Sequence, residues 1–269
     1  MKTKELLTVI ALTANNLSAY AQSFIVCETN GNKTEYRTQN VEYIGFTEED
    51  NSSDATNMHN GHEYVDLGLP SGTMWATCNV GATSETAEGD YYAWGETETK
   101  EVYERSNYKW YEAGDCKKVI KYNLNPSFGN VDNLLTLEPE DDVASVKWGG
   151  DWRMPTSSQC RELFSYCRWK YVGKISENGD IVHGWQITGV NNHSIFLVCG
   201  GRANSRTNGL YLYYWSSSVN VSSSSYSSNS HQYSDYLYNT NGGFTTVQLM
   251  DTMYRENGNS VRPVVVITH

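Results

Sequence analysis

The sequence lacks the features that mark several classes of protein. It has no cluster of Lys and Arg, and its formal net charge of −11 repels the phosphate backbone of nucleic acid. Beyond its N-terminal region it has no apolar run of the ~18 residues that a membrane-spanning helix requires. We therefore expect neither a nucleic-acid partner nor a membrane span.

Catalytic motifs are missing as well. The chain contains no Gly-rich phosphate loop, no nucleophile elbow and no zinc motif. Its dispersed histidines His183, His193 and His231 have no ligand spacing, so we interpret them as structural or solvated. We predict no catalytic residues, no metal ligands and no cofactor. A pair of carboxylates of the glycosidase type stays open, because its members need not be close in sequence.

Three of the four charged residue types are absent from one long stretch. From Thr207 to Tyr254 there is no Lys, Arg or Glu, and most residues are Ser, Tyr, Asn or Thr. This composition is too polar for a core and too rich in rings for a flexible linker. Tyr supplies a large, stiff contact area, and Ser and Asn supply adaptable hydrogen bonds. The stretch therefore predicts an exposed binding surface on a rigid scaffold.

The N-terminus predicts export. Lys2 and Lys4 precede a short apolar run, and Ala19-Tyr20-Ala21 forms a small-residue cleavage site. We expect residues 1–21 to be a signal peptide and the protein to be periplasmic, at the cell surface or secreted. Residues 22–47 alternate around an Asn-Gly turn, which predicts a small β-hairpin element. Residues 48–61 are acidic and Ser/Asn-rich, as expected of a linker.

An exported chain with six cysteines is free to form disulfides, and six cysteines allow fifteen pairings. Cys160 and Cys167 would lie seven residues apart on one helix, roughly 10 Å by helical rise, which is too far for a bond between them. For any other pair, bridging and reduced burial both stay open.

The main domain, residues 62–269, combines short β-like segments with few helical patterns. One helix is expected after Pro139, and a second is expected to open at the capping box Thr156 to Gln159. The segments around Glu63–Leu69, Met74–Cys78 and Val261–Ile267 alternate as strands. These patterns predict an α+β fold with two main helices, short strands and long irregular loops.

Six blocks, in order over residues 62–266, resemble the Fibrobacter succinogenes major paralogous domain family, which is abundant in gut Bacteroidetes. They are Tyr64–Leu69, Met74–Ala82, Gly89–Glu96, Trp148–Thr156, Tyr214–Ser218 and Ser260–Val264. The resemblance implies a C-type-lectin-like fold of the formylglycine-generating-enzyme kind. Members with this fold include variable proteins of diversity-generating retroelements, whose C-terminal regions are rewritten at adenines. The mixture of Ser, Tyr, Asn, His and Asp between Asn220 and Asn241 fits that process, and it also fits ordinary drift of a surface loop.

The resemblance also bears on chemistry. Formylglycine-generating enzymes work through a pair of cysteines near the C-terminal end, and this chain has no Cys after Cys199. The His-x3-His-x-Glu set of the related sulfoxide synthases and the calcium tripeptides of true C-type lectins are also missing. A structural calcium held by scattered oxygens stays open. Such an enzyme is therefore only a remote alternative.

We predict that the chain is a non-enzymatic protein that binds a protein or glycan through its Tyr/Ser/Asn-rich surface. Alternation in this stretch predicts that Leu237 is buried and that Tyr236 and Tyr238 face outward. Trp215 is expected in the core, because a Trp flanked by Tyr and small residues commonly anchors a sheet. The alternative is a structural or assembly subunit of a bacterial cell-surface structure. The predicted ligand-binding residues are Tyr211, Tyr213, Asn220, Ser222, Ser224, Tyr226, Asn229, His231, Tyr233, Asp235, Tyr236, Tyr238, Asn239 and Asn241.

Overall fold

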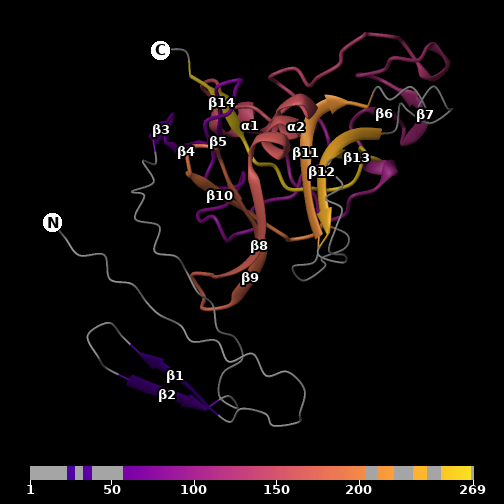
Figure 1. The fold of residues 1–269 in the computed structure, drawn as a ribbon. Helices are drawn as coiled ribbons and strands as arrows, with labels where there is room; N and C mark the ends of the chain where they lie inside the picture. Colours follow the sequence, from indigo (N-terminus) through magenta and orange to yellow (C-terminus); the bar gives the residue numbers. More distant parts are fainter. Residues whose placement is uncertain are drawn as a thin grey trace, which may run out of the picture. The chain divides into compact units, whose positions relative to one another are not determined.

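The computed structural model describes six ranges of the chain, which Figure 1 draws in colour: 23–27, 33–37, 57–203, 211–220, 233–240 and 250–267. The chain divides into two compact units, residues 1–50 and residues 51–269, which are described separately. The predicted signal peptide, residues 1–21, lies outside the described residues.

The first unit contains an antiparallel hairpin of β1 (Ser23–Cys27) and β2 (Lys33–Arg37). The register is regular, with Ser23 opposite Arg37 and Cys27 opposite Lys33. The β-hairpin predicted within residues 22–47 is thus confirmed. The Asn-Gly turn that was expected to join the strands lies outside the described residues.

The second unit begins and ends in the same sheet. Its strand order is β14-β5-β4-β3, and each neighbouring pair is antiparallel. The last strand of the chain is therefore an edge neighbour of β5, near the C-terminus marked in Figure 1. The strands are β3 (Asn57–His59), β4 (His62–Asp66), β5 (Thr73–Ala76) and β14 (Val264–Val266).

The predicted linker, residues 48–61, is too long at its C-terminal end. Asn57–His59 forms β3 and pairs with β4 across the turn at Asn60 and Gly61. Both turn residues have positive φ, 44° and 83°, the conformation that favours Asn-Gly in a two-residue hairpin. The Asn-Gly pair was thus the local signal for a hairpin that starts before His62.

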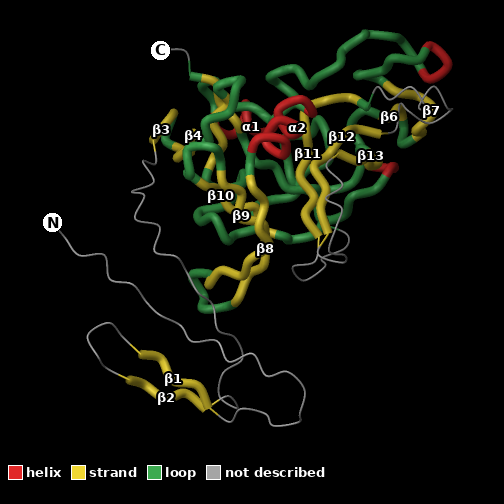
Figure 2. The backbone as a smooth tube through the Cα atoms, viewed as in Figure 1, coloured by secondary structure: helices red, strands yellow, loops and turns green. Residues whose placement is uncertain are grey.

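Two three-stranded antiparallel sheets and one small ribbon complete the strands of the second unit. The sheet orders are β10-β9-β8 and β11-β12-β13, and β6 pairs with β7. Figure 2 shows long loops between these strands. The strands are β6 (Tyr111–Glu112), β7 (Asp115–Val119), β8 (Arg168–Ile175), β9 (Ile181–Thr188), β10 (Ser194–Val198), β11 (Tyr211–Val219), β12 (Tyr233–Thr240) and β13 (Met250–Tyr254).

Both predicted helices are confirmed. Helix α1 (Val143–Trp148) follows Asp142, whose carboxylate accepts hydrogen bonds from the first-turn amides, and Gly149 ends it with φ 63°. Helix α2 (Ser157–Tyr166) opens with the reciprocal capping box of Thr156 and Gln159. Two short 3-10 turns, η2 (Arg105–Asn107) and η3 (Pro126–Phe128), lie in the loops before α1.

The second unit is an α+β structure with two separate hydrophobic cores. Core A gathers rings from the loops around Trp94, Trp110 and Trp152, and Trp215 of β11. Core B contains Val65 and Trp75 of the first sheet, Leu163 of α2, and residues of β9 and β10. The α+β class is confirmed, and the C-type-lectin-like fold stays a prediction. No helix in the described ranges is long and apolar enough to cross a membrane.

The five cysteines of the second unit are all free. Burial raises the pKa of Cys160 and Cys199 to about 12, so both thiols stay protonated and weakly nucleophilic at neutral pH. The described cysteines of the second unit are therefore reduced thiols.

Asp142 makes stability depend on pH. Burial raises the pKa of its carboxyl to about 6, against hydrogen bonds from Met154, Ser145 and Ala144 that lower it. The folded protein therefore holds a proton that the unfolded chain has released. The stabilisation that this bound proton gives the folded protein is fully present below pH ~3.8 and is lost as pH rises through ~6. The free energy of unfolding changes by about 3 kcal/mol over this range.

We expect the free energy of unfolding of the wild type, relative to Asp142→Asn, to fall between pH 4 and pH 6.5. Urea titrations monitored by circular dichroism at several pH values measure this difference. A difference that rises over this range would contradict the assigned direction of the pKa shift.

Candidate functional site

Strand β11, which carries the Tyr-Tyr-Trp-Ser-Ser-Ser motif, lies between the two cores. Trp215 is opposite Tyr236 of β12, and both belong to core A. Tyr214 is opposite Leu237, and both belong to core B. The two faces of the β11–β12 pair are therefore both covered by packed side chains.

This double burial corrects one prediction and confirms two. Tyr236 was expected to face outward, but it is only 4% exposed. Trp215 and Leu237 are buried, as predicted. Alternation along a strand tells which residues share a face, and it separates buried from exposed residues only when one face is open to water.

The three serines of the motif leave the ladder of β11 and β12. The register shifts between Trp215 and Val219, as in a β-bulge. Ser217 instead donates its amide to the Pro155 carbonyl at 2.8 Å and accepts from the Leu137 amide at 2.9 Å. Small side chains let these backbones approach, so the bulge joins β11 to the chain before each helix.

Asp235 and Asn220, both predicted to bind ligand, are buried in a polar network instead. The Asp235 carboxylate accepts from the Ser157 hydroxyl at 2.6 Å and from the Asn220 amide at 2.7 Å. The Ser216 hydroxyl donates to the Asp235 carbonyl at 2.8 Å. A buried carboxylate needs such partners, and here they tie β12 to the start of α2. Neither residue is at the surface.

Tyr211 and Tyr213 remain half-buried, and they form the exposed end of a series of rings. The Tyr213 ring stacks on Tyr236 with centroids 5.6 Å apart and an angle of 14°. Tyr211 follows at 6.0 Å from Tyr213. The guanidinium of Arg202, a residue that the sequence did not point to, lies 5.9 Å from the Tyr213 centroid. Tyrosine faces with a nearby cation thus rest on a buried aromatic base.

The remaining predicted residues are only partly described. Tyr238 lies opposite Tyr213, Asn239 lies opposite Leu212, and Tyr233 lies opposite Tyr254 of β13. Their backbones are therefore placed, at two ends of the same sheet. Outside the described residues lie Ser222, Ser224, Tyr226, Asn229, His231 and Asn241.

The predicted residues do not form one patch along the sheet. Tyr211 and Val219 are eight residues apart on β11, or ~26 Å at ~3.3 Å per residue. Beside Tyr233, at the Val219 end, Arg105 lies over the exposed ring of Tyr254 at 4.8 Å and pairs with Glu256 at 2.9 Å. The candidate contacts therefore lie at two ends of this sheet. The Tyr211 end contains Tyr211, Tyr213 and Arg202, and the Tyr254 end contains Tyr254 and Arg105.

Two buried arginines fix the scaffold beneath these ends. Arg262 donates to the Asn79 side chain at 2.7 Å and to the Phe196 carbonyl at 2.9 Å. Arg255 donates to the Ser234 hydroxyl of β12 and lies 4.7 Å from the Trp94 centroid. Burial lowers the pKa of both groups below that of a free guanidinium. Their hydrogen bonds therefore join segments that are far apart in sequence.

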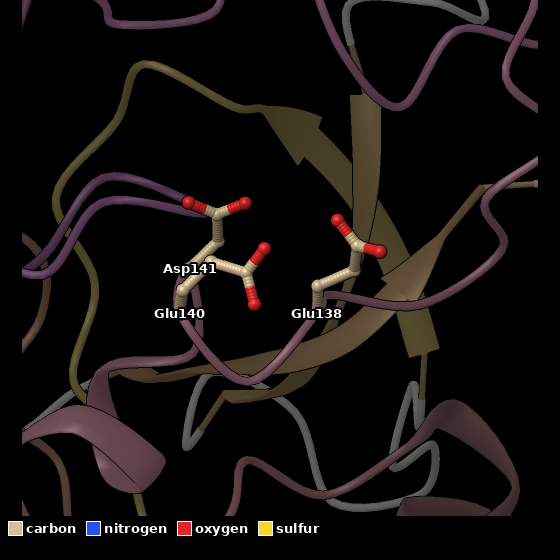
Figure 3. A group of neighbouring side chains, drawn as sticks. All are labelled: Glu138, Glu140 and Asp141. Atoms are coloured by element: carbon tan, nitrogen blue, oxygen red, sulfur yellow. The ribbon is translucent and has the colours of Figure 1, made fainter.

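A cluster of three carboxylates lies close enough together to hold a metal ion: Glu138, Glu140 and Asp141. Figure 3 shows the three side chains on one short turn. The protein's own cations occupy it, because Lys121 pairs with both Glu138 and Asp141, and Lys109 pairs with Asp141 at 2.9 Å. Burial alone would raise the pKa of Asp141, but hydrogen bonds from Lys121, Lys109 and Tyr122 outweigh it and lower the pKa. Lysines therefore already pair with the carboxylates that a metal ion would need.

No family model matches the chain, and no curated protein and no solved structure is similar to it. The resemblance to the Fibrobacter succinogenes family therefore stays a prediction from the motifs.

Tyr236 and Tyr211 should contribute differently to stability, because Tyr236 is buried beneath Tyr213 and Tyr211 is half-buried at the exposed end. Tyr236→Ala leaves a cavity beneath Tyr213 and should lower the free energy of unfolding by about 3 to 5 kcal/mol, as for other large aromatic truncations. Tyr211→Ser should lower it by about 1 kcal/mol or less. Urea unfolding of both variants measures the contrast. Equal losses would show that Tyr211 is part of the core.

Proposed function

We propose that this chain is an exported, non-enzymatic ligand-binding protein that presents tyrosines from a C-type-lectin-like scaffold to a protein or glycan. The observation that carries the proposal is the half-buried pair Tyr211 and Tyr213 above the buried ring of Tyr236. A ring that is held in place before binding loses little conformational freedom on contact, so it contributes more to affinity.

The chemistry of the Tyr211 end supports recognition of a ring or an apolar patch. Tyr faces stack on the apolar faces of sugars and of protein side chains, and their hydroxyls add directional hydrogen bonds. Arg202 beside Tyr213 adds a cation that can orient an acidic or hydroxyl-rich group. The neighbouring sequence from Thr207 to Tyr254 contributes no Lys, Arg or Glu, which favours contact by shape and hydrogen bonding.

The non-enzymatic part of the proposal is supported by how the described reactive groups are used. The carboxylate of Asp235 is held between Ser157 and Asn220, and that of Asp142 caps α1. Asp141 is neutralised by Lys109 and Lys121. Each of these acids supports the fold by contacts that would have to break before it could act on a substrate.

The assembly-subunit alternative is connected with the first unit. An isolated two-stranded hairpin is marginally stable in water, so a covering surface would stabilise the β1–β2 pair. Pairing of this hairpin with another chain would favour assembly over ligand capture. Retroelement diversification is a separate hypothesis, and an imperfect repeat of codons 210–260 beside a reverse transcriptase gene, differing only at adenines, would establish it.

The ligand-binding proposal predicts that the double variant Tyr211→Ser, Tyr213→Ser loses binding. We would screen the labelled full chain on a glycan array and on a panel of immobilised extracellular proteins, and measure each hit by biolayer interferometry. Removing two stacked rings should weaken a true hit by about tenfold or more, because interface aromatics each contribute about 1 kcal/mol or more.

Tyr166→Ser is the matched control. Tyr166 is a 51% exposed tyrosine at the end of α2, outside the β11–β12 pair. This variant should keep the affinity of the wild type. Hits that the double variant retains at full affinity would contradict the proposed surface.

A further inference from the structure

Strand β8 is a long, regular edge strand. It lies at the end of the β10-β9-β8 sheet, and its only strand partner in the described ranges is β9. All eight residues pair with β9 in unbroken register, from Arg168 opposite Thr188 to Ile175 opposite Ile181. It contains no proline and no bulge, the two devices that most directly block a further strand. Figure 1 shows the β8–β9 hairpin projecting from the rest of the second unit.

The two faces of this edge differ in chemistry. One face carries rings near core B and aliphatic side chains at the tip: Tyr171 stacks on His183 at 5.7 Å, and Ile175 is 76% exposed beside Ile181. The other face carries Arg168, Lys170 and Lys174, with Val172 between the two lysines, because successive side chains of a strand point to opposite faces. An added strand would thus meet an apolar row on one side and a cationic row on the other.

Two of the three cations on this face are available to bind acids. Arg168 and Lys170 are exposed, and neither forms an ion pair with a described residue. Lys174 is already paired with Glu85 at 2.7 Å. The strand itself contains no Asp or Glu, although the whole chain has a net charge of −11. The positive charge is therefore local to this edge.

A second copy of the chain is a poor occupant of the edge. In an antiparallel pair of two β8 strands that matches apolar face with apolar face, the cationic residues of both copies share the other face. Like charges opposite each other destabilise a sheet. The same residues that oppose a second copy would attract a strand with carboxylates at alternate positions.

We propose that β8 binds an extended acidic segment of a partner protein as an added strand of the β10-β9-β8 sheet. Main-chain hydrogen bonds along β8 provide affinity, as in other cases of strand addition. Alternate carboxylates of the segment face Arg168 and Lys170, and the intervening apolar side chains lie along Tyr171 and Ile175. This surface is distinct from the proposed Tyr211 end.

The probe is a fluorescein-labelled octapeptide of alternating Glu and Val, titrated with the full chain and followed by fluorescence anisotropy. Two control peptides test the two parts of the proposal. In the first, Lys replaces Glu. In the second, one central Val and its neighbouring Glu are N-methylated, so that each edge of the peptide loses a hydrogen-bond donor. We expect saturable binding of the acidic peptide alone, weakened by added salt.

The variant Arg168→Glu, Lys170→Glu should weaken binding of the acidic peptide about tenfold or more and should prefer the Lys peptide. The control variant Lys117→Glu, Arg161→Glu makes the same change in net charge at two exposed residues elsewhere and should bind like the wild type. Hydrogen exchange should show added protection within Arg168–Ile175 when the acidic peptide is bound.

Three results would overturn the proposal. The acidic peptide fails to bind at high micromolar protein, or binds no better than the Lys peptide. N-methylation leaves affinity unchanged, which means that the contact is not strand addition. Sedimentation shows a dimer that the Arg168→Glu, Lys170→Glu variant disrupts, which assigns the edge to a second copy. Because these variants leave Tyr211 and Tyr213 intact, failure here does not decide the proposed function.

Discussion

The burial of β11 on both faces is the constraint on which the second unit depends. The two buried rings of the strand, Tyr214 and Trp215, must also satisfy their polar atoms inside the protein. Trp215 donates its indole N–H to the Tyr92 carbonyl at 2.8 Å, and Tyr214 donates its hydroxyl to the Val198 carbonyl at 3.1 Å. Trp94 returns an N–H to the Ser216 carbonyl. Because Tyr92 and Trp94 come from distant loops and Val198 ends strand β10, β11 fixes the loops of core A and the strands of core B together.

The local parts of this fold could be predicted, because their signals are local. The acids at the start of α1 and the capping box from Thr156 to Gln159 act over two to four residues, and both were predicted. The Asn60-Gly61 turn has an equally local signal, although these two residues were predicted to belong to the linker. The burial of Tyr236 could be predicted only by knowing which residues cover the second face of β12. That cover comes from residues over a hundred positions away, such as Trp94, and periodicity carries no information about it.

Buried polar residues were the least predictable part of the candidate site. Asp235 and Asn220 belong to residue types that are mostly exposed, and their burial is favourable because they hydrogen-bond to each other and because the Ser157 hydroxyl at the start of α2 donates to Asp235. The same holds for Arg262, whose partners include the Ala76 carbonyl and the Asn79 side chain. Polar residues of this kind stabilise the fold when segments that are distant in sequence supply their hydrogen-bond partners. In a Ser/Tyr/Asn-rich stretch, composition alone therefore overstates how much surface is available to a ligand.

The chain's two proposed surfaces differ in the range of their forces. Apart from Arg202 beside Tyr213, the Tyr211 end lies in sequence without Lys, Arg or Glu, so most of its contacts act at van der Waals and hydrogen-bond distance. The β8 edge is cationic within an acidic protein, and a net charge of −11 would repel an acidic segment at long range. At physiological ionic strength the Debye length is about 8 Å, so remote acids are screened while Arg168 and Lys170 act at contact. An acidic strand can therefore be repelled during approach and still be held once it is in register.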